Sequence, residues 1–488
     1  MADNPIKSIR VRFAPSPTGP FHIGNSRTAL FNWFFAKNHN GQFILRIEDT
    51  DKERSKPEFE EDIISGLKSL GLNWDEFYRQ SERIEIYKKY LEKMLEEKKA
   101  YRCFCDKEQL EIERQAMFSQ GLAPKYSGHC RYLKDEAINN LIKENKPFVV
   151  RLKVPEEGEV IFNDLIRGHI KFNLNLLGDI VVAKNLEEPL YNFSVVVDDI
   201  LMKVSHVIRG EDHISNTPKQ IIIFRALGAE EPIFAHLPLI LNSDRSKMSK
   251  RYGDTELRLY LDDGYLPEAI VNFLTFLGWH PKEDKEVMTV SEIIKDFNLK
   301  RVQKAGAIFN IEKLNWFNKH YIASMDIYEL LEKAVNFVPS EWPLTIQILE
   351  AVRGRLTKLS ELEKFVEFFF IRPNYPKELL FWKGKEEFTI ENMKKLYEFI
   401  KESEEKDFLT MDYSPTTGSP LAISCPSTIE KKILGVIPEN QKGDYLWPLR
   451  VALSGKEASP GPFEIMTALG KQESLERLQI AITKLEKE

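Results

Sequence analysis

The chain has few cysteines and no long hydrophobic run. Only four cysteines, Cys103, Cys105, Cys130 and Cys425, occur among its 488 residues, and so few do not form a disulfide framework in a chain of this length. No stretch approaches the length of apolar sequence that a membrane-spanning helix needs, and the first residues lack the apolar segment of a signal peptide. We therefore expect a soluble, cytoplasmic protein.

An excess of positive charge, low-complexity segments and internal repeats are also missing. The net charge of −6 and the pI of about 6.0 argue against a protein that coats nucleic acid non-specifically. They leave room for one particular nucleic-acid partner, because such a site needs only a local basic stripe. The absence of repeats and biased segments excludes solenoids and disordered chains. The length of 488 residues predicts about three domains.

The chain does contain two short signatures in distant parts of its sequence. The first, Pro15–Asn25, lies between a strand-like run, Ile9–Phe13, and a helix-like run, Ser26–Ala36. Free backbone N–H groups and the helix dipole at such a helix N-terminus favour a phosphate. His22 adds a donor without a permanent charge, and the glycines of the turn let a bulky nucleotide approach the backbone.

The second signature, Ser246–Arg251, is a short polar segment with three cations. Lys247, Lys250 and Arg251 suit the negative charge that develops when pyrophosphate leaves a nucleotide. A loop can bring such cations in late, so that they stabilise the transition state more than the ground state. Each signature alone is typical of an ordinary turn or a solvated loop. Together they predict that the chain binds ATP and that the α-phosphate of ATP is attacked.

The pair resembles the two signature sequences of the class I aminoacyl-tRNA synthetases, His-Ile-Gly-His and Lys-Met-Ser-Lys-Ser. This chain has Asn25 and Arg251 at the final positions, which matches the glutamyl branch of that class. The resemblance extends over essentially the whole chain. It is carried by further segments typical of the branch, Arg12–Gly19, Leu45–Asp51, Val197–Met202, Val207–Asp212 and Leu449–Lys456.

The resemblance implies an enzyme that uses ATP and Mg²⁺ to join L-glutamate to AMP and then to tRNA(Glu). It implies His22, Lys247 and Lys250 as catalytic residues, a monomer, and adenylate formation that requires bound tRNA. The implied ATP-binding residues are Pro15, Ser16, Thr18, Gly19, His22, Gly24, Asn25, Lys247, Met248, Ser249, Lys250 and Arg251. The sequence leaves open whether tRNA(Gln) is also charged, in which case an amidotransferase would correct the product and contact the enzyme transiently.

A pocket for an acidic amino acid needs a cation for the side-chain carboxylate and an anion for the α-amino group. Arginine suits the first task because its planar guanidinium binds a carboxylate bidentately. The resemblance implies that glutamate contacts Arg12, Ala14, Ser16, Glu48, Tyr191 and Arg209. Three positions depart from the pattern of the family: Asn192 follows the tyrosine, Val195 replaces an asparagine, and His213 stands where many members have tryptophan.

Three of the cysteines form a possible zinc site, and we expect Cys103–Cys105 at the end of a helix. Cys103, Cys105 and Cys130 offer three thiolates for a tetrahedral Zn²⁺, and either Tyr132 or His129 is available as the fourth ligand. Some bacterial glutamyl synthetases resemble this pattern but have histidine at the position of Tyr132. The alternative is three small buried thiols without a metal. With four protein ligands the site would be structural, because no position is left for a substrate.

The distribution of motifs predicts an α/β catalytic domain, with a doubly wound parallel sheet, that is interrupted by an insertion and followed by an all-helical half. In the second half of the sheet domain we expect a strand at Asn192–Val197 and a helix at Lys219–Leu227. The basic residues Arg353, Arg355 and Lys358 are candidates for tRNA binding, as is the stretch 295–304; solvated helix faces would look the same. The expected segments are 1–95 (catalytic, first half), 96–185 (inserted, acceptor-binding), 186–240 (catalytic, second half), 241–324 (stem contact) and 325–488 (anticodon-binding).

Four alternative functions are weighed against this interpretation. A synthetase that attaches glutamate to a tRNA base is shorter and lacks the anticodon-binding half. A glutaminyl-tRNA synthetase resembles the first half, but its anticodon-binding half consists of β-barrels. A tRNA-binding protein without catalysis would not need His22, Lys250, Glu48 and the arginines. A small-molecule nucleotidyltransferase would not need the long helical region that follows the catalytic half.

Overall fold

The structure is a computed structural model that describes residues 8–248, 255–383, 386–408 and 428–486. The chain forms two compact units, which are treated separately below. Unit 1 comprises Met1–Leu259 and Ile270–Asn310, and unit 2 comprises Tyr260–Ala269 and Ile311–Glu488. None of the described helices is long and apolar enough to span a membrane.

Unit 1 is built on a parallel sheet of five strands in the order β10-β9-β1-β2-β3. The strands are β1 (Arg10–Phe13), β2 (Gln42–Ile47), β3 (Glu76–Arg79), β9 (His206–Gly210) and β10 (Ile233–Leu237). The predicted doubly wound sheet is therefore confirmed. The strand order reverses its direction between β1 and β9, and the carboxyl ends of strands at such a switch point form the ligand crevice of this fold.

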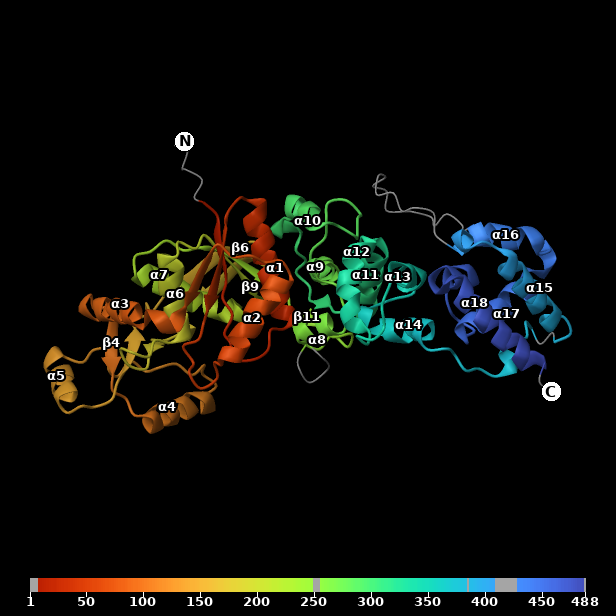
Figure 1. Cartoon of the computed structure of the whole chain (residues 1–488). Coiled ribbons are helices and arrows are strands. Elements are labelled where there is room, and N and C mark those ends of the chain that lie inside the picture. The colour runs from red at the N-terminus through yellow and green to blue at the C-terminus, as the bar shows by residue number, and fades with distance from the viewer. Residues whose placement is uncertain (1–7, 249–254, 384–385, 409–427, 487–488) are drawn as a thin grey trace. The chain divides into compact units, whose positions relative to one another are not determined.

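Helices cover both faces of this sheet (Figure 1). One face carries α1 (Ile23–Asn38) and α2 (Pro57–Ser69), and the other carries α6 (Tyr191–Leu201) and α7 (Thr217–Ala226) with α3 (Ile84–Glu96). Helix α1 is buried along most of its length, because it is enclosed between the sheet and α10. The first residues of α1 are therefore held in a fixed position, and in the sequence they follow the turn after β1.

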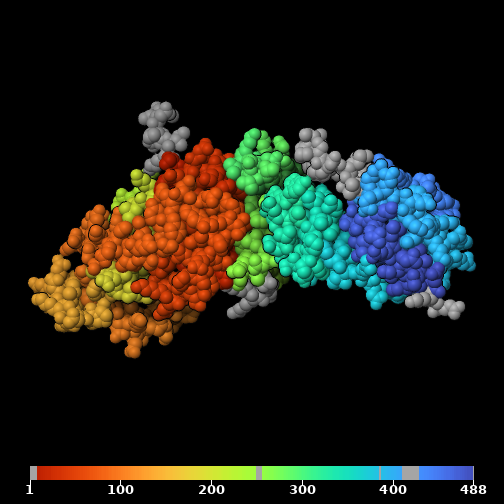
Figure 2. Space-filling view, in the orientation of Figure 1, coloured from red at the N-terminus to blue at the C-terminus, as the bar shows by residue number. Residues whose placement is uncertain are grey.

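The inserted region forms its own small sheets. Strands β4 (Ala100–Cys103), β5 (Val149–Leu152) and β8 (Val181–Ala183) make an antiparallel sheet, and β6 (Glu159–Asp164) pairs with β7 (Gly168–Asn173) as a hairpin. Helices α4 (Lys107–Ser119) and α5 (Asp135–Lys143) lie between β4 and β5 in the sequence. Figure 2 shows these residues, in orange and gold, projecting from the rest of unit 1.

Two local predictions were wrong. The run Asn192–Val197 was expected to be a strand because of its apolar and β-branched residues, yet it lies inside helix α6. That helix is buried along most of its length, so its sequence shows no helical periodicity. Cys103 was placed at the end of a helix, whereas it ends strand β4.

The rest of unit 1 consists of short elements that follow β10 in the sequence. Strands β11 (Ile240–Leu241) and β12 (Ala307–Ile308) pair in parallel. Helix α10 spans Val290–Asp296, and its N-terminus is closed by a capping box between Thr289 and Glu292. Helices α8 (Leu257–Asp262) and α9 (Pro267–Phe276) have residues in both units.

Unit 2 consists of helices and loops, with no β-strand among its described residues. This confirms the predicted all-helical half. The helix α18 bends at Gly470, whose φ of 77° lies in the left-handed region that favours glycine. The helices are α11 (Ile311–Ser324), α12 (Ile327–Ala334), α13 (Ile346–Arg353), α14 (Leu362–Phe370), α15 (Thr389–Glu402), α16 (Thr428–Val436), α17 (Lys442–Ser454) and α18 (Pro462–Glu486).

Candidate active site

The first signature forms the turn between β1 and the N-terminus of α1. His22 is the N-cap of α1, and its Nδ1 accepts a hydrogen bond of 3.2 Å from the backbone N–H of Asn25. The neutral imidazole therefore carries its proton on Nε2. A Cβ at Gly24 would lie 3.1 Å from the His22 ring, so glycine at this position lets the ring lie close over the first turn. Ser16 and Thr18 are exposed on the same turn.

Backbone hydrogen bonds hold the described residues on both sides of the segment 249–254, which contains the end of the second signature. On one side, the N–H of Met248 donates to the carbonyl of Ile240 at 3.0 Å. On the other side, the carbonyl of Thr255 accepts from Ile23 at 2.8 Å, and Glu256 forms a β-bridge with His22. Ser249, Lys250 and Arg251 lie outside the described residues. The described residue before them, Met248, thus lies beside Ile240, and the described residues after them, Thr255 and Glu256, lie beside His22 and Ile23.

Lys247 is the described cation of the second signature. Its side chain is exposed, and its Nζ lies 3.8 Å from Oδ2 of Asp212. Asp212 follows strand β9, at the carboxyl edge of the sheet. The exposed lysine therefore stays available to a phosphate at this edge.

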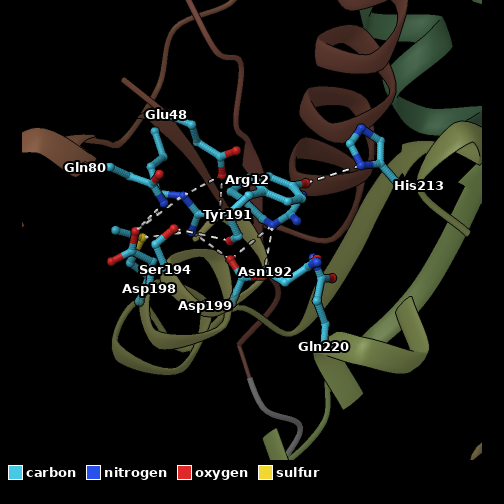
Figure 3. Close-up of polar contacts among 12 residues, drawn as sticks. Arg12, Glu48, Gln80, Tyr191, Asn192, Ser194, Asp198, Asp199, His213 and Gln220 are labelled. Atoms are coloured by element: carbon cyan, nitrogen blue, oxygen red, sulfur yellow. Dashed lines mark hydrogen bonds and ion pairs between the residues drawn. The ribbon is translucent and has the colours of Figure 1, made fainter. Parts of the chain in front are cut away.

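A buried ionic cluster lies beside the turn, at the ends of β1 and β2 and on α6. Arg12 donates to Asp199 at 3.2 Å, and Arg46 donates to Asp199 at 2.7 Å and to Glu48 at 3.0 Å. Figure 3 shows Arg12, Glu48 and Asp199 converging from these elements. All four side chains are less than one-tenth exposed. Buried charges persist only when they are paired, so this cluster holds the backbone edge of the pocket in one arrangement.

The cluster also shifts the protonation of its members. Burial raises the pKa of Glu48, although Arg46 and Arg12 oppose that effect. Burial also acts to raise the pKa of Asp199, but the charges of Arg12 and Arg46 outweigh it and the pKa is lowered. Asp199 therefore stays ionised and orients Arg12.

Arg209 lies at the end of β9 on the other side of the switch point. Its Nε donates to Nε2 of His236 at 3.2 Å, and its Nη2 donates to Oγ1 of Thr217 at 2.8 Å. Among the described residues its Nη1 has no hydrogen-bond partner, although this atom is buried. Burial lowers the pKa of Arg209. An incompletely paired buried guanidinium is costly unless an anionic ligand completes it.

Tyr191 closes the pocket from the first turn of α6. Its hydroxyl lies 3.3 Å from Nδ1 of His213, as Figure 3 shows. Burial raises the pKa of Tyr191, and burial followed by the charge of Arg209 lowers the pKa of His213 to about 4. Both groups are therefore neutral near pH 7. Of the two departures on α6, Asn192 accepts a hydrogen bond from Gln220 at 3.1 Å, whereas Val195 is buried in the core.

Several site residues were not identified from the sequence. Asp199 and its neighbour Asp198 belong to a segment that carried the family resemblance, but no role was assigned to them. Asp198 accepts hydrogen bonds from Gln80, Arg83 and Tyr87 and joins α6 to α3. Two adjacent aspartates inside an apolar run were the available signal, since such charges must be paired when buried.

The structure brings three of the cysteines together. The Sγ atoms of Cys103, Cys105 and Cys130 all lie within 4.8 Å of one another. The hydroxyl of Tyr126 lies 3.3 Å from the Sγ atoms of both Cys103 and Cys105, and it accepts from the backbone N–H of Cys130 at 2.9 Å. Cys425 lies outside the described residues. Hydrogen bonds from Cys130 and Tyr126 lower the pKa of the Cys103 thiol to about 4.

The two residues expected as fourth ligands do not face this cluster. Tyr132 is 75% exposed, and its hydroxyl donates to Glu156 at 2.5 Å. The ring of His129 is half exposed and pairs with Glu113 at 2.8 Å. Tyr126 therefore occupies the fourth side of the cluster. Tyr126 precedes Cys130 by four residues, and this spacing was the signal in the sequence that could have identified Tyr126 as a neighbour of the cysteines.

The basic residues expected to bind tRNA differ in their surroundings within unit 2. Arg353 pairs with Glu350 at 3.0 Å, and Lys358 pairs with Asp263 at 2.5 Å. Arg355 is exposed beyond the end of α13. Of these three residues, only Arg355 has an exposed side chain that forms no ion pair with the described residues.

Comparison with known proteins agrees with this fold and site. Residues 8–316 match the family described as the catalytic domain of class I tRNA synthetases (E and Q). Residues 428–482 match an anticodon binding domain. The parallel sheet and the family match over residues 8–316 thus define a class I tRNA synthetase.

Individual relatives show to which family within this class the chain belongs. A glutamate–tRNA ligase of Aquifex aeolicus is 44% identical over 98% of this chain and 100% of that protein. Glutamate–tRNA ligase 2 of Thermoanaerobacter pseudethanolicus is 43% identical over 99% of both. The crystal structure of a glutamate tRNA ligase from Elizabethkingia meningosepticum in complex with its amino acid gives a TM-score of 0.85 at 34% identity, covering 98% of this chain and 100% of that chain. This chain belongs to the glutamate–tRNA ligase family.

Proposed function

We propose that this enzyme joins L-glutamate to tRNA(Glu) at the expense of ATP. An oxygen of the glutamate α-carboxylate attacks the α-phosphorus of ATP, and the bond to pyrophosphate breaks. A ribose hydroxyl at the 3′ end of the tRNA then attacks the glutamyl carbonyl and releases AMP. The main observation behind this proposal concerns Arg209, which lies at the mouth of the sheet. Its guanidinium is buried, and its Nη1 has no hydrogen-bond partner among the described residues. The substrates place the reaction in the cytoplasm.

The charge of the pocket favours glutamate over glutamine. Four buried or largely buried guanidinium groups, those of Arg12, Arg46, Arg83 and Arg209, are offset by three buried carboxylates, those of Glu48, Asp198 and Asp199. The remaining positive charge is matched by glutamate, whose net charge is −1, and not by neutral glutamine. A buried site built for an anion discriminates strongly against an amide, because its donors are left unpaired.

The nucleotide end of the site acts by alignment and by charge. The glutamate carboxylate is already a nucleophile, so no Ser, Cys or His nucleophile is required. The Nε2 proton of His22 and the N–H groups at the start of α1 are placed to hold phosphate oxygens. Lys247 and Lys250 neutralise the departing pyrophosphate, a role they share with Mg²⁺, which supplies additional positive charge when it is bound.

Charging assays on purified tRNA(Glu) and tRNA(Gln) from the source organism test this function. We expect glutamate to be attached to tRNA(Glu) with the release of AMP and pyrophosphate. Charging of tRNA(Gln) as well would identify a non-discriminating enzyme whose product an amidotransferase must correct. Glutamine as substrate, or no charging of either tRNA, would contradict the proposal and favour the glutaminyl or the base-modifying alternative.

We assign the remaining segments by the same proposal. The inserted residues 96–185 hold the acceptor end of the tRNA, residues 241–324 contact its stem, and residues 325–488 read the anticodon, as a single monomer on one tRNA. The helical character of unit 2 and the anticodon-domain match at 428–482 support this assignment. They also disfavour a β-barrel glutaminyl enzyme and a shorter base-modifying enzyme.

Arg355 offers a direct test of the tRNA contact. Replacing Arg355 with alanine should raise the KM for tRNA about 5- to 30-fold, because a phosphate or base contact of an arginine contributes about 1–2 kcal/mol. Its effect should decline as salt is added. Arg353→Ala is the matched control, since Arg353 is already paired with Glu350. Equal effects of both variants, or a change in the KM for glutamate, would refute the assignment.

The cysteine cluster fits a structural Zn²⁺. Three thiolates and one oxygen at about 2.0–2.3 Å from a metal form a tetrahedron of ligands, and the observed contacts of 3.3–3.5 Å between these atoms are close to its edges. Burial and the hydrogen bonds to Cys103 and Cys105 raise the pKa of Tyr126, although the N–H of Cys130 opposes them, so a bound metal would have to displace the phenol proton. We propose Cys103, Cys105, Cys130 and Tyr126 as the ligands. The metal would hold the inserted region together and take no part in the chemistry.

Zinc affinity distinguishes the two tyrosines. Tyr126→Phe should weaken Zn²⁺ binding at least about 10- to 100-fold, since it removes a group in direct contact with the metal. Tyr132→Phe should leave the affinity unchanged. Competition with a chromophoric chelator gives both values. The opposite order, or wild-type protein that takes up no stoichiometric zinc, would contradict this ligand set.

A further inference from the structure

A buried hydrogen-bonded array connects the inserted region to the glutamate pocket. His236 on β10 and Arg209 on β9 are neighbours in the register of the parallel sheet, so their side chains leave the same face. His236 is fully buried, and Asp164, at the end of β6, is 4% exposed. Nδ1 of His236 lies 2.6 Å from Oδ2 of Asp164. The array thus runs from the β6–β7 hairpin through β10 to Arg209.

The hydrogen bonds determine the tautomer of His236. Asp164 also accepts backbone N–H groups from Ile166, Arg167 and His236 itself, at 2.8–3.2 Å, which keeps it an ionised acceptor. His236 Nδ1 must therefore carry the proton. Arg209 is a donor only, so His236 Nε2 must be the acceptor of the 3.2 Å contact with Arg209 Nε. A protonated Nε2 would point its N–H at the guanidinium.

Thr217 occupies the same edge of the guanidinium. Its Oγ1 accepts from Nη2 of Arg209 at 2.8 Å and lies 3.0 Å from Nε2 of His236. The N–H groups of the Nε/Nη2 edge are thereby occupied by protein acceptors. The donors left over are on the terminal edge, where Nη1 has no hydrogen-bond partner among the described residues.

We propose that His236, held as the Nδ1–H tautomer by Asp164, is a positioning residue that sets the affinity for glutamate. Together with Thr217 it fixes Arg209 so that the terminal Nη1/Nη2 edge alone faces the side-chain carboxylate of the substrate. A guanidinium that is fixed in this way loses less freedom when it binds a carboxylate bidentately. The proposal rests on the role of Arg209 in glutamate binding given above.

Two substitutions at His236 separate positioning from packing. His236→Gln places an amide oxygen near the position of Nε2, where it can accept from Arg209. His236→Asn places its amide near Nδ1, where it can contact Asp164 but not Arg209. In glutamate charging, His236→Asn should raise the KM for glutamate about 10- to 100-fold, the range for a hydrogen bond to a charged group. His236→Gln should recover most of this loss, and kcat and the KM for ATP should stay within about twofold.

Equal KM values for the two variants, or a loss confined to kcat, would overturn the proposal. If thermal unfolding shows that neither variant folds, Thr217→Val decides instead, because it removes the acceptor at Nη2 with little change in volume. This variant should raise the KM for glutamate at least about threefold, and an unchanged KM would refute the array. A wild-type enzyme that does not charge glutamate would instead refute the proposed function.

Discussion

Replacing Lys250 with alanine is expected to slow the formation of glutamyl-adenylate about 10²–10³-fold, which is the usual loss when one donor to a developing anion is removed. The segment that contains Lys250 is attached to Ile240 on one side and to the His22 turn on the other. In the proposed mechanism, the cation acts at the point where pyrophosphate leaves. Because that charge exists only in the transition state, kcat should fall while the KM for ATP changes little.

The exchange of pyrophosphate into ATP, measured with glutamate and tRNA present, reports this step. Lys93→Ala is a suitable control, because Lys93 is an exposed lysine on α3 of the same unit, outside the inserted region, and pairs with Glu97 at 3.8 Å. Thermal unfolding should be unchanged in both variants. A Lys250→Ala enzyme with undiminished exchange would show that the second signature has no catalytic role in this protein.

Replacing Arg209 with alanine is expected to lower kcat/KM for glutamate about 10²–10³-fold. Removing one partner of a buried, hydrogen-bonded charge pair costs about 2–5 kcal/mol, much of it because the remaining charge stays unpaired. Here the unpaired group would be the substrate carboxylate. The KM for ATP should stay close to its wild-type value, since Arg209 lies across the switch point from the His22 turn.

Steady-state charging at varied glutamate and varied ATP gives both constants. Arg225→Ala provides the matched control, because Arg225 is exposed near the end of α7 and pairs with Glu231 at 2.7 Å. An Arg209→Ala enzyme that keeps its glutamate KM would place the side-chain carboxylate elsewhere, with Arg12 as the next candidate. A parallel gain of activity with glutamine would support the charge-based account of specificity.

Much of the fold around the candidate site could be predicted because the residues that form it belong to contiguous segments. The segment Pro15–Asn25 predicts a phosphate site, because a strand, a glycine-containing turn and the start of a helix follow one another there. All three are local features of the sequence. The parallel sheet follows from alternating strand and helix patterns, and the helical half follows from one helical run after another. The helix α6 was mistaken for a strand, because burial on most sides removes the periodicity that would reveal a helix.

Long-range pairing could not be predicted in the same way. Asp199 faces Arg12 and Arg46 across 187 and 153 residues of sequence, and His236 meets Asp164 across 72. Tyr126 rather than Tyr132 lies beside the thiols, although both tyrosines flank Cys130 in the sequence. These choices depend on which way a side chain leaves its backbone, and no local pattern records that direction.

The sequence by itself determined the class of reaction and the fold class, because both are encoded in short segments with their own local geometry. Only the tertiary structure decided which edge of Arg209 is left for a substrate, which tyrosine completes the cysteine cluster, and how the inserted hairpin reaches the glutamate pocket. These properties arise from desolvation. A charge or thiol that is taken out of water must find a partner, and the partner is chosen by what the fold brings within hydrogen-bond distance.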